Sequence, residues 1–400
     1  MFLDDVQCGT ANAGPALGFS WYTRHRVVLA TLPLMDFRAR QKKLREHLAI
    51  TRFDALLISH LPNIRYMCGF TGSAGFLLVQ EDSSVFFTDV RYDTQARTEV
   101  KGAKVVIARK ALLPAVGEWI SASRRRSRHP WTLGVEPEHT TIGEKQRLGE
   151  TLASGIRVKS ASPIVERARM VKDEDELKRI RAAVQLGASL FERARQVLRA
   201  GVKESEVAAE MEYAARRGGA EEMSFATIIA SGARSALPHG RASEQAIPAG
   251  AFVVCDFGVI LHGYCSDRTR TVWVGEPEEE ARRAYEAVRE AQQAAIDVVK
   301  PGIAAGDVDA AARNVLRKAG LGRYFSHSTG HGVGLEIHEG PRVAAGQKEV
   351  LQPGMVITIE PGVYFPGKWG VRIEDMVAVT RQGCEVLTPT GKDFLAIQSS

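Results

Sequence analysis

Apolar and polar positions along the chain form two successive patterns. From Asp36 to about Val165, short apolar runs alternate with segments of helical periodicity such as residues 36–50. The runs of strand length are residues 53–59, 83–89, 104–109 and 132–137, and a glycine-rich turn within residues 63–79 feeds one more strand. Alternating strands and helices predict an α/β layer for this part of the chain.

Beyond residue 165 the pattern changes to long amphipathic helices interleaved with pairs of strands. The predicted helices are residues 173–199, 204–218 and 277–300. The run of acids that begins at Asp173 favours a helix start there. A succession of helix, helix and hairpin recurs around 204–274 and 305–380, which indicates internal pseudo-symmetry. This second part is therefore predicted to be α+β.

The two patterns divide the 400 residues into three segments. We predict an N-terminal extension of residues 1–35, an α/β domain of residues 36–165 and an α+β domain of residues 166–400. The extension is rich in Gly, Ala and Asn, and it lacks the basic start and apolar core of a signal peptide. The stretch "GFTGSAGF" does not match a phosphate-binding loop, so we interpret it as a tight turn.

Composition excludes several classes of function. A net charge of +6 is small for a chain of this length and does not suggest a nucleic-acid binder. No apolar run approaches the roughly 18 residues of a membrane span. The five cysteines are odd in number and contain no C-x-x-C pair, which favours reduced thiols. We therefore expect a cytoplasmic protein that binds neither nucleic acid nor membrane.

The stretch "VVCDFGVILHGYCSDRTRTVW" places two acids where the apolar pattern predicts the interior. If its two runs form an antiparallel hairpin centred between Leu261 and His262, Asp256 lies opposite Asp267. Directly opposed residues share a face, with Cβ atoms about 4.5–5.5 Å apart. Two bare carboxylates at that distance repel each other, and a cation between them would remove the repulsion.

The same arrangement occurs again in "MVITIEPGVYFPGKWGVRIEDMVAV". Glu360 ends one apolar strand, Glu374 lies in the returning strand, and the centre between them is Gly367 in the turn signal "FPGK". Four buried carboxylates oppose folding through desolvation and mutual repulsion. Two divalent metal ions would neutralise all four, so the sequence predicts a two-metal site.

A histidine cluster supplies the imidazole that such a site would use. The segment "FSHSTGHGVGLEIHEGPR" contains His327, His331 and His338, and His239 lies in the loop-like stretch "SGARSALPHGRAS". Glycines beside His331 allow the backbone and a ligand to approach closely. A carboxylate-rich shell with an imidazole suits Mn²⁺, which we expect as the metal, with Co²⁺, Zn²⁺ and Fe²⁺ as alternatives.

These motifs, together with "GHGVGLEIHEGP", "ITIEPGVY" and "GVRIED", resemble the five-ligand signature of the pita-bread metallopeptidases. That family includes methionine aminopeptidase, aminopeptidase P and prolidase. "NIRYMCGFTGSAGFLLV" and "FFTDVRYDTQA" resemble the smaller domain of the last two, so the resemblance covers residues 36–390. It implies a creatinase-like N-terminal α/β domain and an α+β pita-bread (creatinase/aminopeptidase-like) C-terminal catalytic domain.

The resemblance also implies roles for individual residues. The implied metal ligands are Asp256, Asp267, His331, Glu360 and Glu374, of which Asp267 and Glu374 would bridge both ions. Glu360 is the expected general base, and it would pass a proton to the proline nitrogen of the substrate. His239 and His338 would bind the substrate and assist the tetrahedral state. His327 would contact the peptide or relay a proton, and Arg372 would support the ligand carboxylates.

The implied reaction is hydrolysis of the N-terminal Xaa-Pro bond of peptides with proline at the second position. The glycine-rich stretch resembles small bacterial aminopeptidase P, which we expect to be the type. Arg342 instead matches an arginine that meets the free carboxylate of dipeptides in some prolidases, so a dipeptidase is the alternative. A metal-free creatinase-like hydrolase and a non-catalytic binding protein are remote alternatives, because both lack the acidic ligand set that this chain retains.

Two positions depart from the pattern of the family. Phe225 stands where longer members carry a tyrosine that hydrogen-bonds a metal ligand, so that support is expected to be absent. Trp369 stands where a smaller or aliphatic residue is common, and either packing or a place at the pocket mouth would explain it. The resemblance further suggests a homodimer.

Overall fold

The structure is a computed structural model that describes residues 35–124 and 130–398. The predicted extension lies outside the described residues except for Met35. All of the described residues belong to one compact unit.

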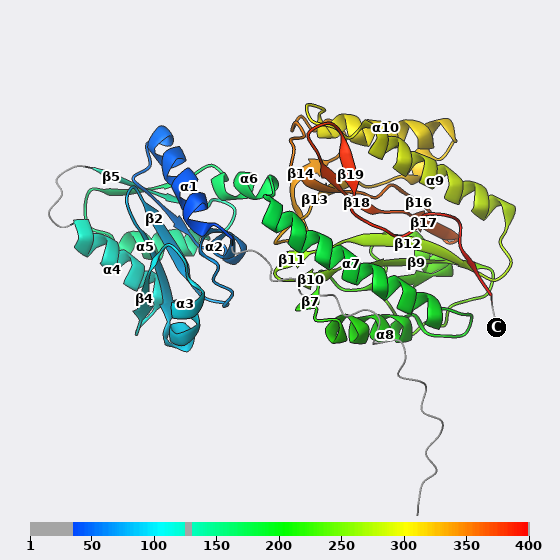
Figure 1. Ribbon diagram of the computed structural model, residues 1–400, viewed down its shortest axis with the longest axis horizontal. Coiled ribbons are helices and arrows are strands. Elements are labelled where there is room, and N and C mark those ends of the chain that lie inside the picture. The colour runs from blue at the N-terminus through cyan, green and yellow to red at the C-terminus, as the bar shows by residue number, and fades with distance from the viewer. Residues whose placement is uncertain (1–34, 125–129, 399–400) are drawn as a thin grey trace, which may run out of the picture. The chain divides into compact units, whose positions relative to one another are not determined.

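The first half of this unit is built on a six-stranded mixed sheet of order β4-β3-β2-β1-β5-β6 (Figure 1). Its strands are β1 (Ala55–Ile58), β2 (Phe76–Gln80), β3 (Ser84–Asp89), β4 (Lys104–Ala108), β5 (Trp131–Val135) and β6 (Ile156–Ser160). Its helices are α1 (Phe37–Thr51), α2 (Leu61–Cys68), α3 (Asp93–Glu99), α4 (Leu112–Arg124) and α5 (Ile142–Thr151). The predicted α/β layer is confirmed, but helix α2 was not expected.

Helix α6 (Ile164–Met170) leads into α7 (Glu174–Val197), the long helix that opens the second half. Asp173 caps α7 as its acidic run predicts, because its side chain accepts hydrogen bonds from the backbone N–H groups of Asp175 and Glu176. The side chain of Glu176 accepts a hydrogen bond from the backbone N–H of Asp173, which completes a capping box.

Two pairs of helices enclose the sheets of the second half. Helices α7 and α8 (Glu204–Arg217) cover one side, and α9 (Glu279–Val298) and α10 (Ala305–Lys318) cover the other (Figure 1). One sheet has the order β20-β12-β9-β8 and another β14-β13-β15-β18-β19. The strands are β7 (Glu222–Met223), β8 (Ile228–Ser231), β9 (Ala251–Phe257), β10 (Val259–Leu261), β11 (Tyr264–Cys265), β12 (Arg268–Val274), β13 (Gly330–Gly332), β14 (Glu339–Val343), β15 (Val356–Ile359), β16 (Gly362–Phe365), β17 (Trp369–Arg372), β18 (Asp375–Val379), β19 (Cys384–Val386) and β20 (Ala396–Ile397).

Alternation along β9 decides which side chains face the space between the sheets. Val253, Cys255 and Phe257 pack with α7 and α8, whereas Phe252 packs with α9 and the second sheet. Asp256 has the parity of Phe252, so its side chain points away from α7 and α8. An acid at this strand end therefore faces the interior of the fold.

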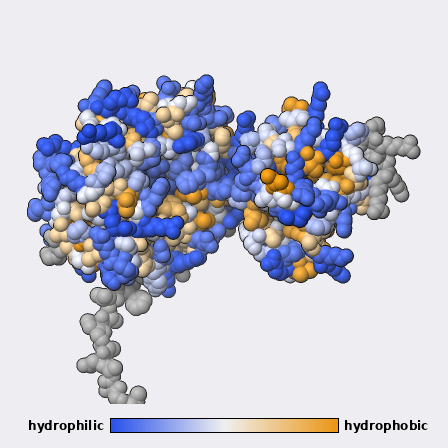
Figure 2. All heavy atoms as spheres, turned by 180° about the vertical axis from the view of Figure 1, so that it is seen from behind, coloured by the Kyte–Doolittle hydropathy of each residue, from blue (hydrophilic) through white to orange (hydrophobic). Residues whose placement is uncertain are grey.

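Figure 2 shows the distribution of hydrophilic and hydrophobic side chains on one face of the molecule. Hydrophilic side chains cover most of the face drawn in Figure 2, and the hydrophobic ones form small separate groups. None of the helices in residues 35–124 and 130–398 is long and apolar enough to cross a bilayer.

Candidate metal centre

The register of the first acidic hairpin differs from the prediction by two residues. Asp256 pairs with Thr269, not with Asp267, because the turn is centred between His262 and Gly263. His262 and Gly263 both have positive φ, which fits a tight two-residue turn. A shift of two residues keeps the parity of the strand, so Asp267 still lies on the same face as Asp256.

The second acidic hairpin has the predicted register. Pairs on both sides of the acids, Ile359 with Asp375 and Gly362 with Arg372, place Glu360 opposite Glu374. The turn is centred on Gly367, whose φ of 75° favours glycine. The centre of this hairpin was correctly predicted because the strands on either side of the turn are equal in length.

The ten residues to which the sequence analysis assigned a role in the site all line one cavity of about 540 Å³. They are Asp256, Asp267, His331, Glu360 and Glu374, with His239, His327, His338, Arg342 and Arg372. Phe225 lines it as well. Four separate segments, 225–267, 327–342, Glu360 and 372–374, thus meet at one place.

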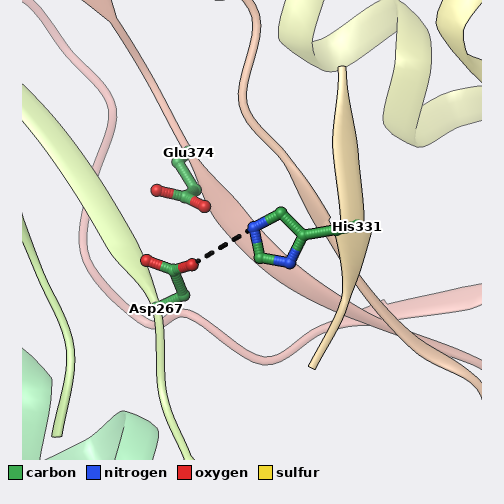
Figure 3. Close-up of side chains that lie close together, drawn as sticks. All are labelled: Asp267, His331 and Glu374. Atoms are coloured by element: carbon green, nitrogen blue, oxygen red, sulfur yellow. Dashed lines mark ion pairs between the residues drawn. The ribbon is translucent and has the colours of Figure 1, made fainter. Parts of the chain in front are cut away.

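Asp267, His331 and Glu374 form the tightest group in this cavity. Their ligand atoms all lie within 4.8 Å of one another, and the three side chains converge from different elements (Figure 3). His331 Nε2 lies 3.6 Å from Asp267 Oδ2 and 3.5 Å from Glu360 Oε1. His331 Nδ1 donates to the carbonyl of Gly332, so Nε2 carries the lone pair that a metal would need.

Arg372 organises the other side of the cavity. Its guanidinium donates to Asp256 Oδ2 at 2.5 Å, to the Thr269 hydroxyl at 3.0 Å and to the Tyr364 hydroxyl at 2.7 Å. Thr269 in turn donates to Glu374 Oε2 at 2.7 Å. One buried cation therefore orients two of the carboxylates, one directly and one through a hydroxyl.

The four carboxylates have raised pKa values because burial removes them from water. The pKa of Glu360 rises to about 8, and Asp256 also opposes its ionisation. Burial, then neighbouring carboxylates, raise the pKa values of Asp267 and Glu374 well above the ordinary range. Burial also raises the pKa of Asp256, although Arg372 acts against it.

The donor set fits divalent cations. Asp256 Oδ1 is buried and has no hydrogen-bond partner within the described residues. An orphaned carboxylate oxygen, beside like charges and a neutral imidazole, is an arrangement that a cation stabilises and that water alone does not. Four oxygen donors and one nitrogen match the hard divalent ions predicted from the sequence.

The remaining histidines differ in how they are held. His239 and His338 are exposed at the cavity, and the His338 ring meets that of His331 edge-on, with centroids 4.5 Å apart. His327 has both nitrogens engaged: Nδ1 donates to the Ser328 carbonyl, and Nε2 accepts from the Tyr364 hydroxyl. His327 also lines the cavity, and its expected role in contacting the peptide or relaying a proton stays a prediction.

Sequence reasoning missed Thr269 and Tyr364, which link Arg372 to the site. Thr269 stands two residues after Asp267 and so shares its face, a signal that alternation alone could have given. Tyr364 lies four residues after Glu360 and offered no comparable signal. Trp369 is buried against Phe252 and Phe365. Of the two explanations offered for Trp369, the structure therefore supports packing.

Replacing Arg372 with methionine is expected to weaken metal binding by about 10–100-fold. Arg372 lowers the pKa values of both Asp256 and Glu360, so its loss makes the carboxylates harder to ionise. Calorimetric titration of the metal-free protein with Mn²⁺ would measure the change. The control is Arg181→Met, because Arg181 forms an exposed ion pair with Glu385. Equal affinities in the two variants would contradict the prediction.

Comparisons with known proteins show which family the chain resembles along most of its length. The family described as "Metallopeptidase family M24" matches residues 178–381, and "Creatinase/Prolidase N-terminal domain" matches residues 40–171. A Xaa-Pro dipeptidase of Pyrococcus horikoshii is 39% identical over 361 residues, covering 88% of this chain and 98% of the relative. A solved Xaa-Pro dipeptidase from Bacillus anthracis is 38% identical with a TM-score of 0.85, covering 90% and 100%. A solved X-Pro aminopeptidase from Thermotoga maritima is 36% identical with a TM-score of 0.81, covering 90% and 99%.

Proposed function

The chain belongs to metallopeptidase family M24, with a creatinase/prolidase N-terminal domain, and on this premise we propose that it hydrolyses Xaa-Pro dipeptides. Family membership makes it a metal-dependent exopeptidase of the Xaa-Pro type. Beyond this activity, we propose that the substrates are dipeptides rather than longer peptides. The named relatives include both dipeptidases and an aminopeptidase, so their names support either length.

Arg342 carries the proposal for dipeptides. It lies on β14, lines the cavity, is exposed, and forms no hydrogen bond or ion pair with the residues that the structure describes. A free cation at a peptide-binding cavity suits a carboxylate, which a guanidinium can bind through two parallel hydrogen bonds. In a dipeptide, the C-terminal carboxylate belongs to the proline itself, so it would lie close to the scissile bond.

Aminopeptidase P, the type expected from the sequence, is the second candidate. The Thermotoga maritima relative bears an X-Pro aminopeptidase name at an identity close to that of the dipeptidases. The same cavity would then accept a longer peptide, and Arg342 would meet a peptide carbonyl in place of a carboxylate. This candidate predicts little dependence of the reaction on a free proline carboxylate.

Replacing Arg342 with glutamine separates these candidates. For a dipeptidase we expect the kcat/KM for Ala-Pro to fall by about 10²-fold, because a charge-assisted bond to the substrate is worth about 1.5–3 kcal/mol. Steady-state kinetics with Ala-Pro, Ala-Pro amide and Arg-Pro-Pro would measure it. Efficient cleavage of Arg-Pro-Pro by the parent, with no loss for Ala-Pro in the variant, would favour aminopeptidase P.

We propose that Asp256, Asp267, His331, Glu360 and Glu374 hold two divalent ions, with Mn²⁺ as the first choice for a carboxylate-rich shell. Bound ions of this kind lower the pKa of a water molecule and polarise the scissile carbonyl. The chain itself would supply the proton transfers and the orientation of the peptide.

Glu360 is the residue proposed to move the proton. It lies within the cavity beside His331, and Thr358 donates to its Oε1 at 3.4 Å. As a carboxylate it would accept a proton from the attacking water and release it to the proline nitrogen as the bond breaks. Cations nearby would keep it ionised at neutral pH, despite the raised pKa that burial imposes.

His239 and His338 are proposed to stabilise the charge that develops on the carbonyl oxygen. Both line the cavity, and neither donates a hydrogen bond to another described residue. Their N–H groups are therefore available to an oxyanion. His327, which accepts a hydrogen bond from the Tyr364 hydroxyl, is proposed to contact the peptide or relay a proton. The homodimer and the cytoplasmic compartment stay predictions.

A further inference from the structure

We propose that Arg169 is a positioning residue, through which the N-terminal domain holds the segment that reads the substrate. That segment is residues 336–342, and it contains His338 and Arg342. The inference rests on the substrate roles proposed for these two side chains. Every described residue that lines the cavity falls within 225–374, so the N-terminal domain supplies none of them directly.

Arg169 binds the segment through two of its carboxylates, and one of them, Glu339, itself lines the cavity. It lies near the end of α6, is only 2% exposed, and donates through Nη2 to the carboxylates of Glu336 and Glu339. These two acids lie on either side of His338, and Glu339 begins β14, the strand that carries Arg342. Fixing both acids therefore fixes the backbone around His338 and the start of the strand that leads to Arg342.

Glu339 is the more deeply held of the two acids. Its side chain is 6% exposed, and it accepts from Arg169 Nη2, from Lys172 Nζ at 3.2 Å and from the N–H of Glu336 at 3.0 Å. The pKa of Glu339 is lowered, because Lys172 and Arg169 outweigh its burial. A buried, ionised carboxylate held by two cations allows little movement of the chain that carries it.

The other terminal nitrogen of the Arg169 guanidinium contacts the N-terminal domain. Nη1 donates to Asn63 Oδ1 at 2.7 Å, and the amide of Asn63 donates to Glu136 and Glu166, each at 2.7 Å. Glu136 also accepts from the backbone N–H groups of Ser59 and His60. One planar guanidinium thus joins a buried network of Asn63, on α2, and Glu136, directly after β5, to Glu339 in the wall of the cavity.

Other contacts also hold residues 336–342, but none of them binds both acids as the Arg169 guanidinium does. His60 Nε2 lies 2.9 Å from Glu336 Oε2. A Cβ atom added to Gly340 would lie 2.9 Å from Met170 Sδ, so glycine allows the connecting chain to pack tightly there. Lys172 cannot replace Arg169, because an ammonium lacks the planar geometry that serves three partners at once.

The test compares Arg169→Met with a matched variant, Arg40→Met. Arg40 is also buried and joins the same two domains, through Asp173, Glu176 and the Tyr66 carbonyl, but contacts nothing in 336–342. Hydrogen exchange of peptides covering 335–343, measured by mass spectrometry, reports the segment without reference to activity. The preference for Ala-Pro over Ala-Pro amide reports Arg342.

We expect Arg169→Met to raise exchange in 335–343 and to lower that preference about tenfold or more, since small misplacements of binding groups have such effects. Arg40→Met should leave both unchanged, bound metal should stay at the parent level in both, and Arg169→Lys should be intermediate. Unchanged exchange in Arg169→Met and Arg169→Lys, or equal increases in Arg169→Met and Arg40→Met, would overturn the inference. A parent enzyme that shows no preference would contradict the proposed dipeptide function instead, and the exchange data alone would then decide the inference.

Discussion

Asp267→Ala is expected to lower kcat/KM for Xaa-Pro peptides by about 10³-fold or more, which corresponds to about 4 kcal/mol of transition-state stabilisation. Asp267 is central to the closest group of potential ligands, with His331 Nε2 and a Glu374 oxygen inside the same 4.8 Å cluster. Removing it takes one donor from the place where both proposed ions would meet. Metal analysis of the purified variant should show less than the parent stoichiometry.

The same variant should not be less stable when metal is absent, and this separates loss of function from loss of fold. Burial, Asp256 and Glu360 all raise the pKa of Asp267, so its charge opposes folding in the metal-free protein. We expect the Tm of metal-free Asp267→Ala at pH 8 to equal or exceed that of the metal-free parent. Asp393→Ala, at an exposed residue, is the control for activity. Parent-level hydrolysis by Asp267→Ala would refute the metal assignment.

The sequence predicted the main architecture because its two periodicities are well separated. The α/β half and the helices that begin near 173, 204 and 277 are confirmed, as is the pita-bread class. The boundaries of the domains stay predictions. Helix α2 was missed because its eight residues, Leu61–Cys68, run directly into a glycine turn and show too little periodicity to stand out.

The sequence could predict those features of the site that depend on which strand face a residue occupies and on where each hairpin turns. Glu360 and Glu374 face each other because a turn at Gly367 has equal arms. Asp256 and Asp267 are offset because the turn is displaced by one residue, yet parity keeps both on the inner face. The interactions of Tyr364 and Arg169 could not be predicted, since they join segments whose contacts arise only when separate elements pack.

Removing metal should make stability depend steeply on pH between about 6.5 and 8. The pKa of Glu360 is raised from its ordinary value to about 8, so between these values the folded state binds a proton that the unfolded state has lost. Stability is therefore greatest at the lower end of this window and falls as pH rises through it, at up to about 1.4 kcal/mol per unit for each such group. Over the window, Glu360 alone would contribute about 2 kcal/mol, or about 2–4 °C in Tm for a chain of this length.

The pH window begins at 6.5 because, below this pH, protonation of histidines makes stability fall with decreasing pH. Burial lowers the pKa values of His327 and His331 to about 4, so their contribution to stability is lost as pH falls through that range. Thermal unfolding of chelator-treated protein at pH 6.5, 7.2 and 8 should show the decline. Mn²⁺ at 1,000 times its Kd should restore about 4 kcal/mol and flatten the profile, since a cation keeps the carboxylates ionised without penalty. Glu360→Gln should reduce the slope without metal. A slope that Mn²⁺ leaves unchanged would contradict the premise that these four acids are stable together because cations neutralise them.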